Sequence, residues 1–167
     1  SVLAELLKNW ESSLHPNVKL AYLPSESRVR LRLSIKGDDK HKLNDILDHE
    51  AQKLKNIIPE FIYGEEKDRI EQRIGELLLS NNAKVATAES FTSGYLSHLI
   101  SSVPGSSAYY RGSILAYDNE IKENILNVSH DSIKNYGVVS EQVVKEMALS
   151  VKKIMGVDYA LSTSGIA

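Results

Sequence analysis

The sequence predicts an α/β protein made of a small α+β domain followed by a mostly parallel, three-layer α/β domain. Between residues 1 and 66, two segments alternate apolar and polar residues with period two, and helical patterns flank them. From residue 67 onward, short runs rich in β-branched residues alternate with helical segments, an order that favours a parallel sheet. We therefore expect one domain over 1–66 and a second over 67–167.

The composition restricts the class of protein. The chain has 167 residues, of which 42% are hydrophobic and 25% charged, values ordinary for a soluble globular protein. A net charge of −2 gives no global attraction to nucleic acid or anionic lipid, and the absence of cysteine excludes disulfides, a thiol nucleophile and thiolate metal sites. No apolar run approaches the roughly 20 residues that span a bilayer. We expect a cytoplasmic protein without a membrane segment.

Five elements are expected in the first domain. Leu3, Leu6, Leu7 and Trp10 recur at helical spacing before the break at 15–16. The later elements are strands over 18–23 and 29–35 joined by a hairpin turn at 24–27, a helix carrying Leu43 to Leu54 that Pro59 ends, and a short strand over 60–63.

The second domain alternates helices and strands. A closing strand with no helix after it would leave a buried parallel sheet uncovered, so we expect the chain to be a fragment of a longer protein. The predicted elements are a helix over 67–79, a strand from 85 to 90, a helix through 101, a turn at 103–107, an extended run over 109–117, a short helix from 119, a longer helix that Ser140 caps and Gly156 ends, and a strand over 158–162.

The most informative segment is the predicted strand-to-helix turn from Val85 to Gly94. A run of alanine and β-branched residues stops at Glu89, and three hydroxyl residues, Ser90, Thr92 and Ser93, follow within four positions. Ligands of open α/β sheets bind outside the carboxyl ends of the strands, where helix N-termini offer unpaired N–H groups. Ser90 and Thr92 therefore lie where a nucleophile or an anion-binding group would be placed.

A second group of candidate residues follows the next predicted strand. Tyr117 and Lys122 come 27 and 32 residues after Ser90, which is the length of one strand–helix–strand crossover. Two neighbouring parallel strands would present all three residues at one edge of the sheet. A lysine whose pKa is lowered by burial can take the proton from a serine hydroxyl, and Tyr117 could relay that proton or donate to an oxyanion.

Each of these residues also has a purely structural interpretation. Ser90 or Thr92 could cap a helix, Lys122 could be a solvated side chain, and Glu89 could favour a helix N-terminus or pair with a cation. No histidine has metal-ligand spacing, and no phosphate-binding glycine loop or dinucleotide fingerprint occurs. We expect neither a metal nor a cofactor. The histidines are at positions 15, 41, 49, 98 and 130.

The strand over 29–35 carries a possible basic stripe. Alternation places Arg28, Arg30 and Arg32 on one face, which could follow a phosphate backbone. Acidic residues lie close by at 26, 38 and 39, and the Gly-x-x-Gly clamp of a KH module is absent. We interpret this face as solvated or salt-bridged, and nucleic acid is not an expected partner.

Ordered landmarks over about residues 68 to 167 resemble the C-terminal domain of the CinA (competence/damage-inducible) family. The front part, with Trp10, residues 21–24 and residues 30–33, resembles the KH-like middle domain of full-length members. The landmarks of the second domain are Ala88 to Ser90 with Thr92 and Gly94, then residues 102–107, 117–122, 136–141, 147–148 and 164–167.

The resemblance implies a bacterial nicotinamide-nucleotide amidase of pyridine nucleotide salvage. Such enzymes hydrolyse the carboxamide of nicotinamide mononucleotide to nicotinate mononucleotide and ammonia, without a cofactor. By position, Ser90, Tyr117 and Lys122 match the family's proposed serine–lysine catalytic group. We expect Glu89, Thr92, Gly94, Ser164 and Gly165 to bind substrate, and we expect a homo-oligomer, with a dimer as the simplest form.

Two departures from the family's motif fall in the turn. Phe91 stands where the family has cysteine, and Ser93 where it has the first of two glycines. Further strands that the family places after the Gly-Ile-Ala segment are absent, so this chain could be inactive.

The alternative to the amidase function belongs to another class of protein. In this alternative, the chain is a vestigial amidase that serves as an interaction or nucleic-acid-binding module.

Overall fold

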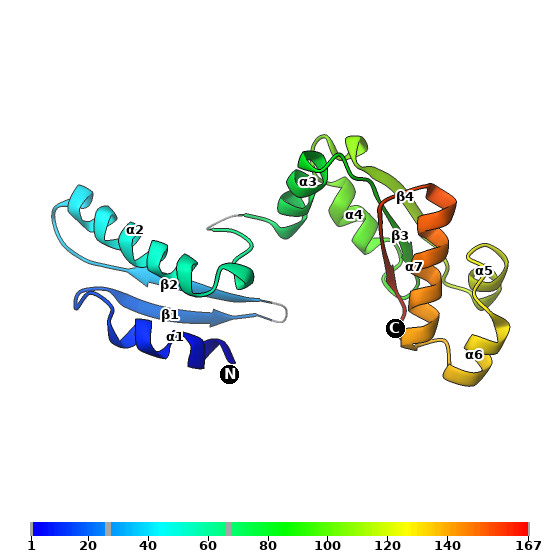
Figure 1. Ribbon diagram of the computed structural model, residues 1–167, viewed down its shortest axis with the longest axis horizontal. Helices are drawn as coiled ribbons and strands as arrows, with labels where there is room; N and C mark the ends of the chain where they lie inside the picture. Colours follow the sequence, from blue (N-terminus) through cyan, green and yellow to red (C-terminus); the bar gives the residue numbers. More distant parts are fainter. Residues whose placement is uncertain (1, 26–27, 66–67, 167) are drawn as a thin grey trace. The chain divides into compact units, whose positions relative to one another are not determined.

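A computed structural model describes residues 2–25, 28–65 and 68–166 of the chain (Figure 1). The chain divides into two compact units, Ser1–Glu65 and Glu66–Ala167. Among the described residues, no helix is both long enough and apolar enough to cross a membrane.

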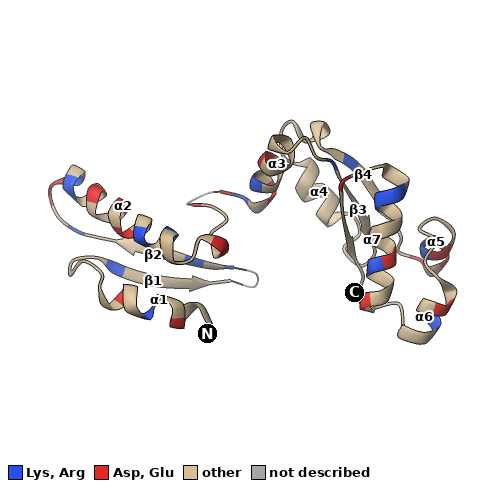
Figure 2. Cartoon of the chain, in the orientation of Figure 1, with Lys and Arg blue, Asp and Glu red and all other residues tan. Residues whose placement is uncertain are grey.

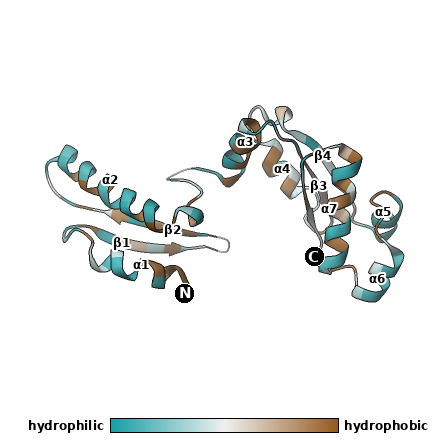
Figure 3. Cartoon of the chain, in the orientation of Figure 1, coloured by the Kyte–Doolittle hydropathy of each residue, from teal (hydrophilic) through white to brown (hydrophobic). Residues whose placement is uncertain are grey.

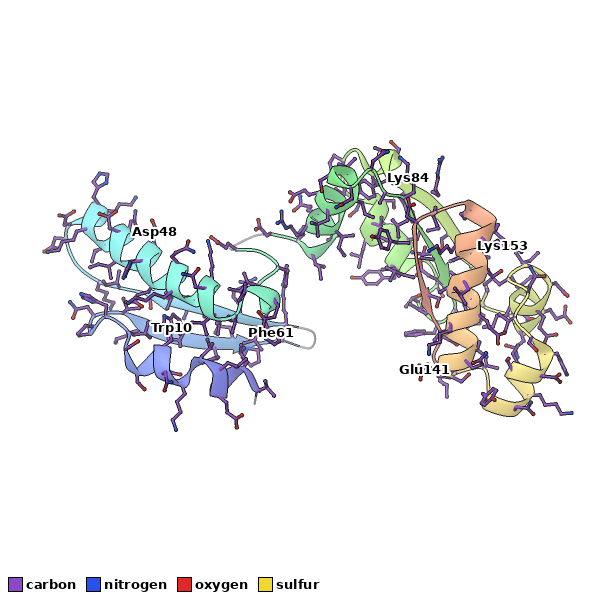
Figure 4. All side chains as sticks on the ribbon, in the orientation of Figure 1. Trp10, Asp48, Phe61, Lys84, Glu141 and Lys153 are labelled. Carbon is purple, nitrogen blue, oxygen red and sulfur yellow. The ribbon has the colours of Figure 1, made fainter. Side chains whose placement is uncertain are left out.

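The first unit packs two helices on one face of an antiparallel hairpin. Strands β1 and β2 pair in a register that runs from Lys19 opposite Ser34 to Pro24 opposite Val29. Trp10 lies on the hairpin side of the first helix (Figure 4), and its ring is buried with the apolar residues of the second helix. The elements are α1 (Val2–Ser12), β1 (Lys19–Pro24), β2 (Val29–Ser34), α2 (Lys40–Ile57) and a 3-10 helix, η1 (Pro59–Phe61).

The end of this unit corrects one prediction. The strand expected over 60–63 is wrong, because Pro59–Phe61 forms η1 and the Phe61 N–H donates to the Ile58 carbonyl at 3.1 Å. Proline has a φ suited to the first turn of a helix, and this local preference prevails over the apolar run that follows it. Of the predicted hairpin turn, residues 26 and 27 lie outside the described residues.

The second unit is built on three parallel strands in the order β4-β3-β5. The central strand β3 is buried along its whole length, as a parallel strand covered on both faces must be. The elements are α3 (Ile70–Ser80), β3 (Val85–Glu89), α4 (Tyr95–Ser101), η2 (Ser106–Ala108), β4 (Tyr110–Leu115), α5 (Asn119–Asn124), α6 (His130–Tyr136), α7 (Glu141–Met155) and β5 (Tyr159–Thr163).

Helices cover both faces of this sheet, which confirms the predicted three-layer α/β class. Figure 1 shows α7 on one side of the sheet and α4 on the other. Ala86 and Ala88 of β3 pack with α7, whereas Val85 packs with α3 and α4. Helix α7 is mixed in hydropathy along its length (Figure 3), because one of its faces is buried and the other is exposed.

The capping predictions for α7 are confirmed, but one helix was not predicted. Ser140 accepts a hydrogen bond from the Val143 N–H at 3.3 Å, and Gly156 ends the helix with φ 60°. Helix α6 has a polar sequence without an apolar period. A tertiary contact holds its start, since the Glu146 carboxylate accepts hydrogen bonds from the Ser129 N–H at 2.8 Å and the Ser132 hydroxyl at 2.6 Å.

The contact between α3 and Tyr109 gives a stability prediction. A Cβ on Gly75 would lie 2.5 Å from the Tyr109 hydroxyl oxygen, and that tyrosine is only 1% exposed. The hydroxyl makes no hydrogen bond within the described structure. Gly75→Ala should lower the free energy of unfolding by about 1–3 kcal/mol, since overpacking outweighs the gain in helix propensity. Tyr109→Phe should be neutral or stabilising, and should reduce the cost of Gly75→Ala.

Urea unfolding followed by far-UV circular dichroism measures both effects. The chain has one tryptophan, Trp10, and its fluorescence reports on the first unit, which neither substitution touches. An equal cost of Gly75→Ala with Tyr109 and with Phe at position 109 would contradict the proposed clash.

Candidate active site

Glu89, the last residue of β3, is fully buried and holds the start of α4. One carboxylate oxygen accepts hydrogen bonds from the Thr92 hydroxyl at 2.8 Å and the Leu96 N–H at 3.0 Å. The other accepts from the Ser97 N–H at 2.7 Å. A negative charge is favourable at a helix N-terminus, where N–H groups lack partners. Both oxygens are engaged and the side chain has no exposed surface, so Glu89 organises the turn from within.

Ser90 lies directly after Glu89, between the ends of two strands, and is 6% exposed. Its N–H donates to the Thr163 carbonyl of β5 at 3.1 Å, and its carbonyl accepts from the Ser93 N–H at 3.0 Å. The Ser90 hydroxyl makes no hydrogen bond to any residue in the described part of the chain. The backbone of this serine is therefore fixed on both sides, while its Oγ remains available for chemistry.

Neither Ser90 nor Thr92 caps α4. The residue at the N-cap is Gly94, and the Glu89 carboxylate takes the role of a capping side chain. The Thr92 hydroxyl donates to Glu89 and lies 2.7 Å from the Thr163 hydroxyl, which links the turn to β5. The helix-cap interpretation of these two hydroxyls therefore does not describe this turn.

The turn requires left-handed backbone at two successive positions. Ser93 has φ 48° and Gly94 has φ 91°. Glycine adopts this conformation without strain, whereas a serine there is disfavoured. The departure at Ser93 thus places a strained residue where the resemblance leads one to expect glycine.

Lys122 is the most unusual residue of the site, because it is a lysine with only 1% of its surface exposed. It lies in α5, which Asp118 caps by accepting the Glu120 N–H at 2.8 Å. The Lys122 amine donates to the Tyr117 carbonyl at 3.0 Å. Burial lowers the pKa of Lys122 below its ordinary 10.5, and the charge of Asp118 opposes this shift only in part. The side chain is buried rather than solvated, and burial shifts its equilibrium toward the neutral form.

Tyr117 contributes its backbone rather than its side chain to this contact. The side chain is 66% exposed, and among the described residues its hydroxyl makes no hydrogen bond to Ser90 or Lys122. The structure brings the Lys122 amine to the Tyr117 carbonyl and leaves the phenol facing solvent.

The sheet places the candidate residues at one edge. Strands β3 and β4 are parallel neighbours with Glu89 opposite Leu115, and the Ala116 N–H donates to the Glu89 carbonyl at 2.7 Å. Tyr117 follows at once, so the chain that leads to Lys122 leaves β4 beside the end of β3. No hydrogen bond joins Ser90 to Lys122 in the described structure.

The segment after β5 completes this edge. The Ser164 hydroxyl donates to the Val138 carbonyl at 2.9 Å, which ties it to the connection between α6 and α7. A Cβ on Gly165 would lie 2.9 Å from the ring of Phe91, so Phe91 packs directly on the Gly165 backbone. Phe91 stands where the family has cysteine, and its ring fits here because residue 165 has no side chain.

Sequence reasoning missed a polar network beneath the turn. The Thr87 hydroxyl lies 2.8 Å from the Tyr110 hydroxyl, which donates to the Ser97 hydroxyl at 2.7 Å. Thr87 is fully buried in β3, two residues before Glu89. Because Thr87 and Glu89 are two residues apart in β3, both side chains lie on the face of the sheet that α4 covers. The polar residues at this spacing are the sequence signal that could have revealed the network.

The described residues contain no group of three or more histidine or acidic side chains arranged to hold a metal ion. The groups placed at this edge of the sheet are the Ser90 hydroxyl, the Lys122 amine and backbone N–H donors. A hydroxyl, an amine and N–H donors are the groups that acyl transfer from an amide or ester uses.

Two family models match the chain. Residues 67–167 match the CinA C-terminal domain, and residues 1–64 match the damage-inducible protein CinA KH domain. Among similar proteins, a CinA-like protein of Cytophaga hutchinsonii is 44% identical over 167 residues, and a putative competence-damage inducible protein of Halothermothrix orenii is 36% identical over 167 residues. Each match covers 100% of this chain, which spans 40% of the length of each relative.

Solved structures match part of the chain. A competence or damage-inducible protein from Enterobacter asburiae matches with a TM-score of 0.56 and 29% identity, over 57% of this chain and 60% of its own. A CinA superfamily protein from Enterobacter cloacae matches with a TM-score of 0.58 and 28% identity, over 62% of this chain and 63% of its own. The matches confirm the predicted KH-like region and parallel α/β fold, and the chain belongs to the CinA family.

Proposed function

We propose that this protein hydrolyses the carboxamide of nicotinamide mononucleotide to nicotinate mononucleotide and ammonia. Ser90 is the nucleophile and Lys122 is its base. The observation that carries the proposal is the buried Lys122 amine, whose pKa is lowered by burial. It donates to the Tyr117 carbonyl just after β4, beside the end of β3 that Ser90 directly follows. The choice of a nicotinamide nucleotide rests on the CinA resemblance, since the relatives are named only for competence and damage induction.

The reaction follows from the properties of these two groups. Neutral Lys122 takes the proton of the Ser90 hydroxyl as Oγ attacks the carboxamide carbon, which gives a tetrahedral oxyanion. The C–N bond then breaks, the Lys122 ammonium returns its proton to the leaving nitrogen, and ammonia departs from an acyl-serine ester. Water, deprotonated by Lys122, hydrolyses that ester and restores the Ser90 hydroxyl.

Backbone donors are available for the oxyanion. The N–H groups of Phe91 and Thr92 directly follow the nucleophile and make no hydrogen bond within the described residues. Donors fixed before the reaction stabilise the developing charge without reorganisation. We assign the oxyanion site to these two N–H groups, and Thr92, Gly94, Ser164 and Gly165 remain the proposed substrate contacts.

Substitution of the two catalytic residues tests the assignment. Ser90→Ala and Lys122→Met should each lower kcat for ammonia release by about 10³-fold or more, since nucleophile and base act as a unit. Tyr117→Phe keeps the carbonyl that holds Lys122, so it should cost much less. The assay uses nicotinamide mononucleotide and the protein at its natural length. Circular dichroism spectra that match the parent's would verify that each variant is folded, and full activity in folded Ser90→Ala would refute the mechanism.

The pH dependence follows from the lowered pKa of Lys122. A base must be neutral, so kcat/KM should rise with pH as the Lys122 ammonium loses its proton. The midpoint of this rise should lie below 10.5, because burial disfavours the charged form. Measurements of kcat/KM from about pH 5 to pH 10 locate the pH range over which it rises. A flat profile over this range, with activity intact at its acid end, would exclude an amine base.

Glu89 gives a prediction about positioning. Glu89→Gln presents an amide N–H₂ to a site where three donors converge, which leaves at least one backbone N–H of α4 without its acceptor. We expect kcat to fall about 10- to 100-fold with a smaller change in KM, because Ser90 is displaced while Gly94, Ser164 and Gly165, which do not bond to the Glu89 side chain, keep their places. Glu76→Gln, at an exposed carboxylate on α3 that pairs with Arg73, is the matched control and should leave kcat unchanged. Equal effects of the two substitutions would contradict the positioning role.

A further inference from the structure

The β1–β2 hairpin has one covered face and one open face. Its inward residues pack with α1 and α2 around Trp10 and Leu54. In the register of the hairpin, Lys19 pairs with Ser34, Ala21 with Arg32 and Leu23 with Arg30. These six residues alternate with the inward ones and therefore share the opposite face, called here the open hairpin face. The inward residues are Leu20, Tyr22, Leu31 and Leu33.

The open hairpin face is cationic and carries no carboxylate. Lys19, Arg30 and Arg32 are all exposed, and within the described structure none of them forms an ion pair. Figure 2 shows basic but no acidic residues along β1 and β2. Of the nearby acids, Asp39 caps α2 by accepting the Lys42 N–H at 3.2 Å, and Glu26 lies outside the described residues.

The three cations form a row rather than a pocket. Arg30 and Arg32 are two residues apart on one strand, a separation of about 7 Å. Lys19 lies diagonally across from Arg32, at about 7–8 Å. The row therefore extends over roughly 14 Å, which suits a linear polyanion with repeated charges better than one small anion.

We propose that the open hairpin face binds double-stranded DNA through its phosphates, independently of the amidase site. A two-stranded ribbon fits the B-form major groove, about 12 Å wide, whereas the major groove of A-form RNA is too deep and narrow. Among the six residues of this face there is no aromatic ring on which the bases of a single strand could stack. The face replaces the loop of a KH module, whose Gly-x-x-Gly sequence the chain lacks.

The test measures the salt dependence of binding by the full chain to a fluorescent DNA duplex. The logarithm of the association constant should fall linearly with the logarithm of the salt concentration. Arg30→Ala/Arg32→Ala should weaken binding and reduce the magnitude of that slope by about 1.8, since each phosphate contact contributes about 0.9. Arg30→Lys/Arg32→Lys should restore most of the slope.

A charge-matched control separates this face from a general effect of charge. Lys8→Ala/Lys42→Ala removes two exposed lysines from α1 and α2 and should leave the slope unchanged. Trp10 fluorescence verifies that the first unit of each variant is folded. The proposal fails if the parent does not bind DNA, if the control loses as much slope as the arginine variant, or if a duplex RNA, a single strand or polyglutamate binds more tightly than duplex DNA.

Discussion

The arrangement of the second unit depends on the hydrogen bonds that the buried Glu89 carboxylate accepts. Glu89 ends the central strand, and its two oxygens accept hydrogen bonds from the Leu96 and Ser97 N–H groups of α4 and from the Thr92 hydroxyl. Thr92 in turn meets Thr163 at the end of β5. A buried carboxylate is costly unless donors surround it. The same bonds that satisfy its charge fix the turn on which Ser90 lies, so the stability of the fold and the geometry of the site have one cause.

Lys122, in helix α5 just after the neighbouring strand β4, complements this arrangement. Among the described residues its amine donates to one acceptor, the Tyr117 carbonyl, from a side chain with almost no exposed surface. A backbone carbonyl orients the amine without supplying a full negative charge, so the neutral form is not strongly penalised. A carboxylate in direct contact would have stabilised the ammonium and raised its pKa. The site thus combines an oriented amine with a hydroxyl and backbone N–H groups that have no partner among the described residues, a set suited to nucleophilic attack on an amide.

The sequence predicts features that depend on residues within one helix or strand, but not the contacts between residues that are distant in the sequence. The alternation of β1 and β2, the buried run of β3 and the Ser140 cap of α7 were all predicted, because each depends on residues a few positions apart. Helix α6 escaped prediction because Glu146, distant in sequence, holds it. The exposed phenol of Tyr117, the burial of Lys122 and the shared exposed face of Lys19, Arg30 and Arg32 depend on packing and register, which one sequence does not reveal at this precision.

A carbon NMR titration of the Lys122 side chain tests the central claim most directly, since it reads the protonation of the proposed base without an assay of activity. Lys122→Met, the variant that removes the signal, assigns the Cε resonance. A midpoint below 10.5 is the predicted result, because burial disfavours the ammonium. A midpoint at or above that value would show that Lys122 is an ordinary charged lysine and would contradict its role as the base for Ser90.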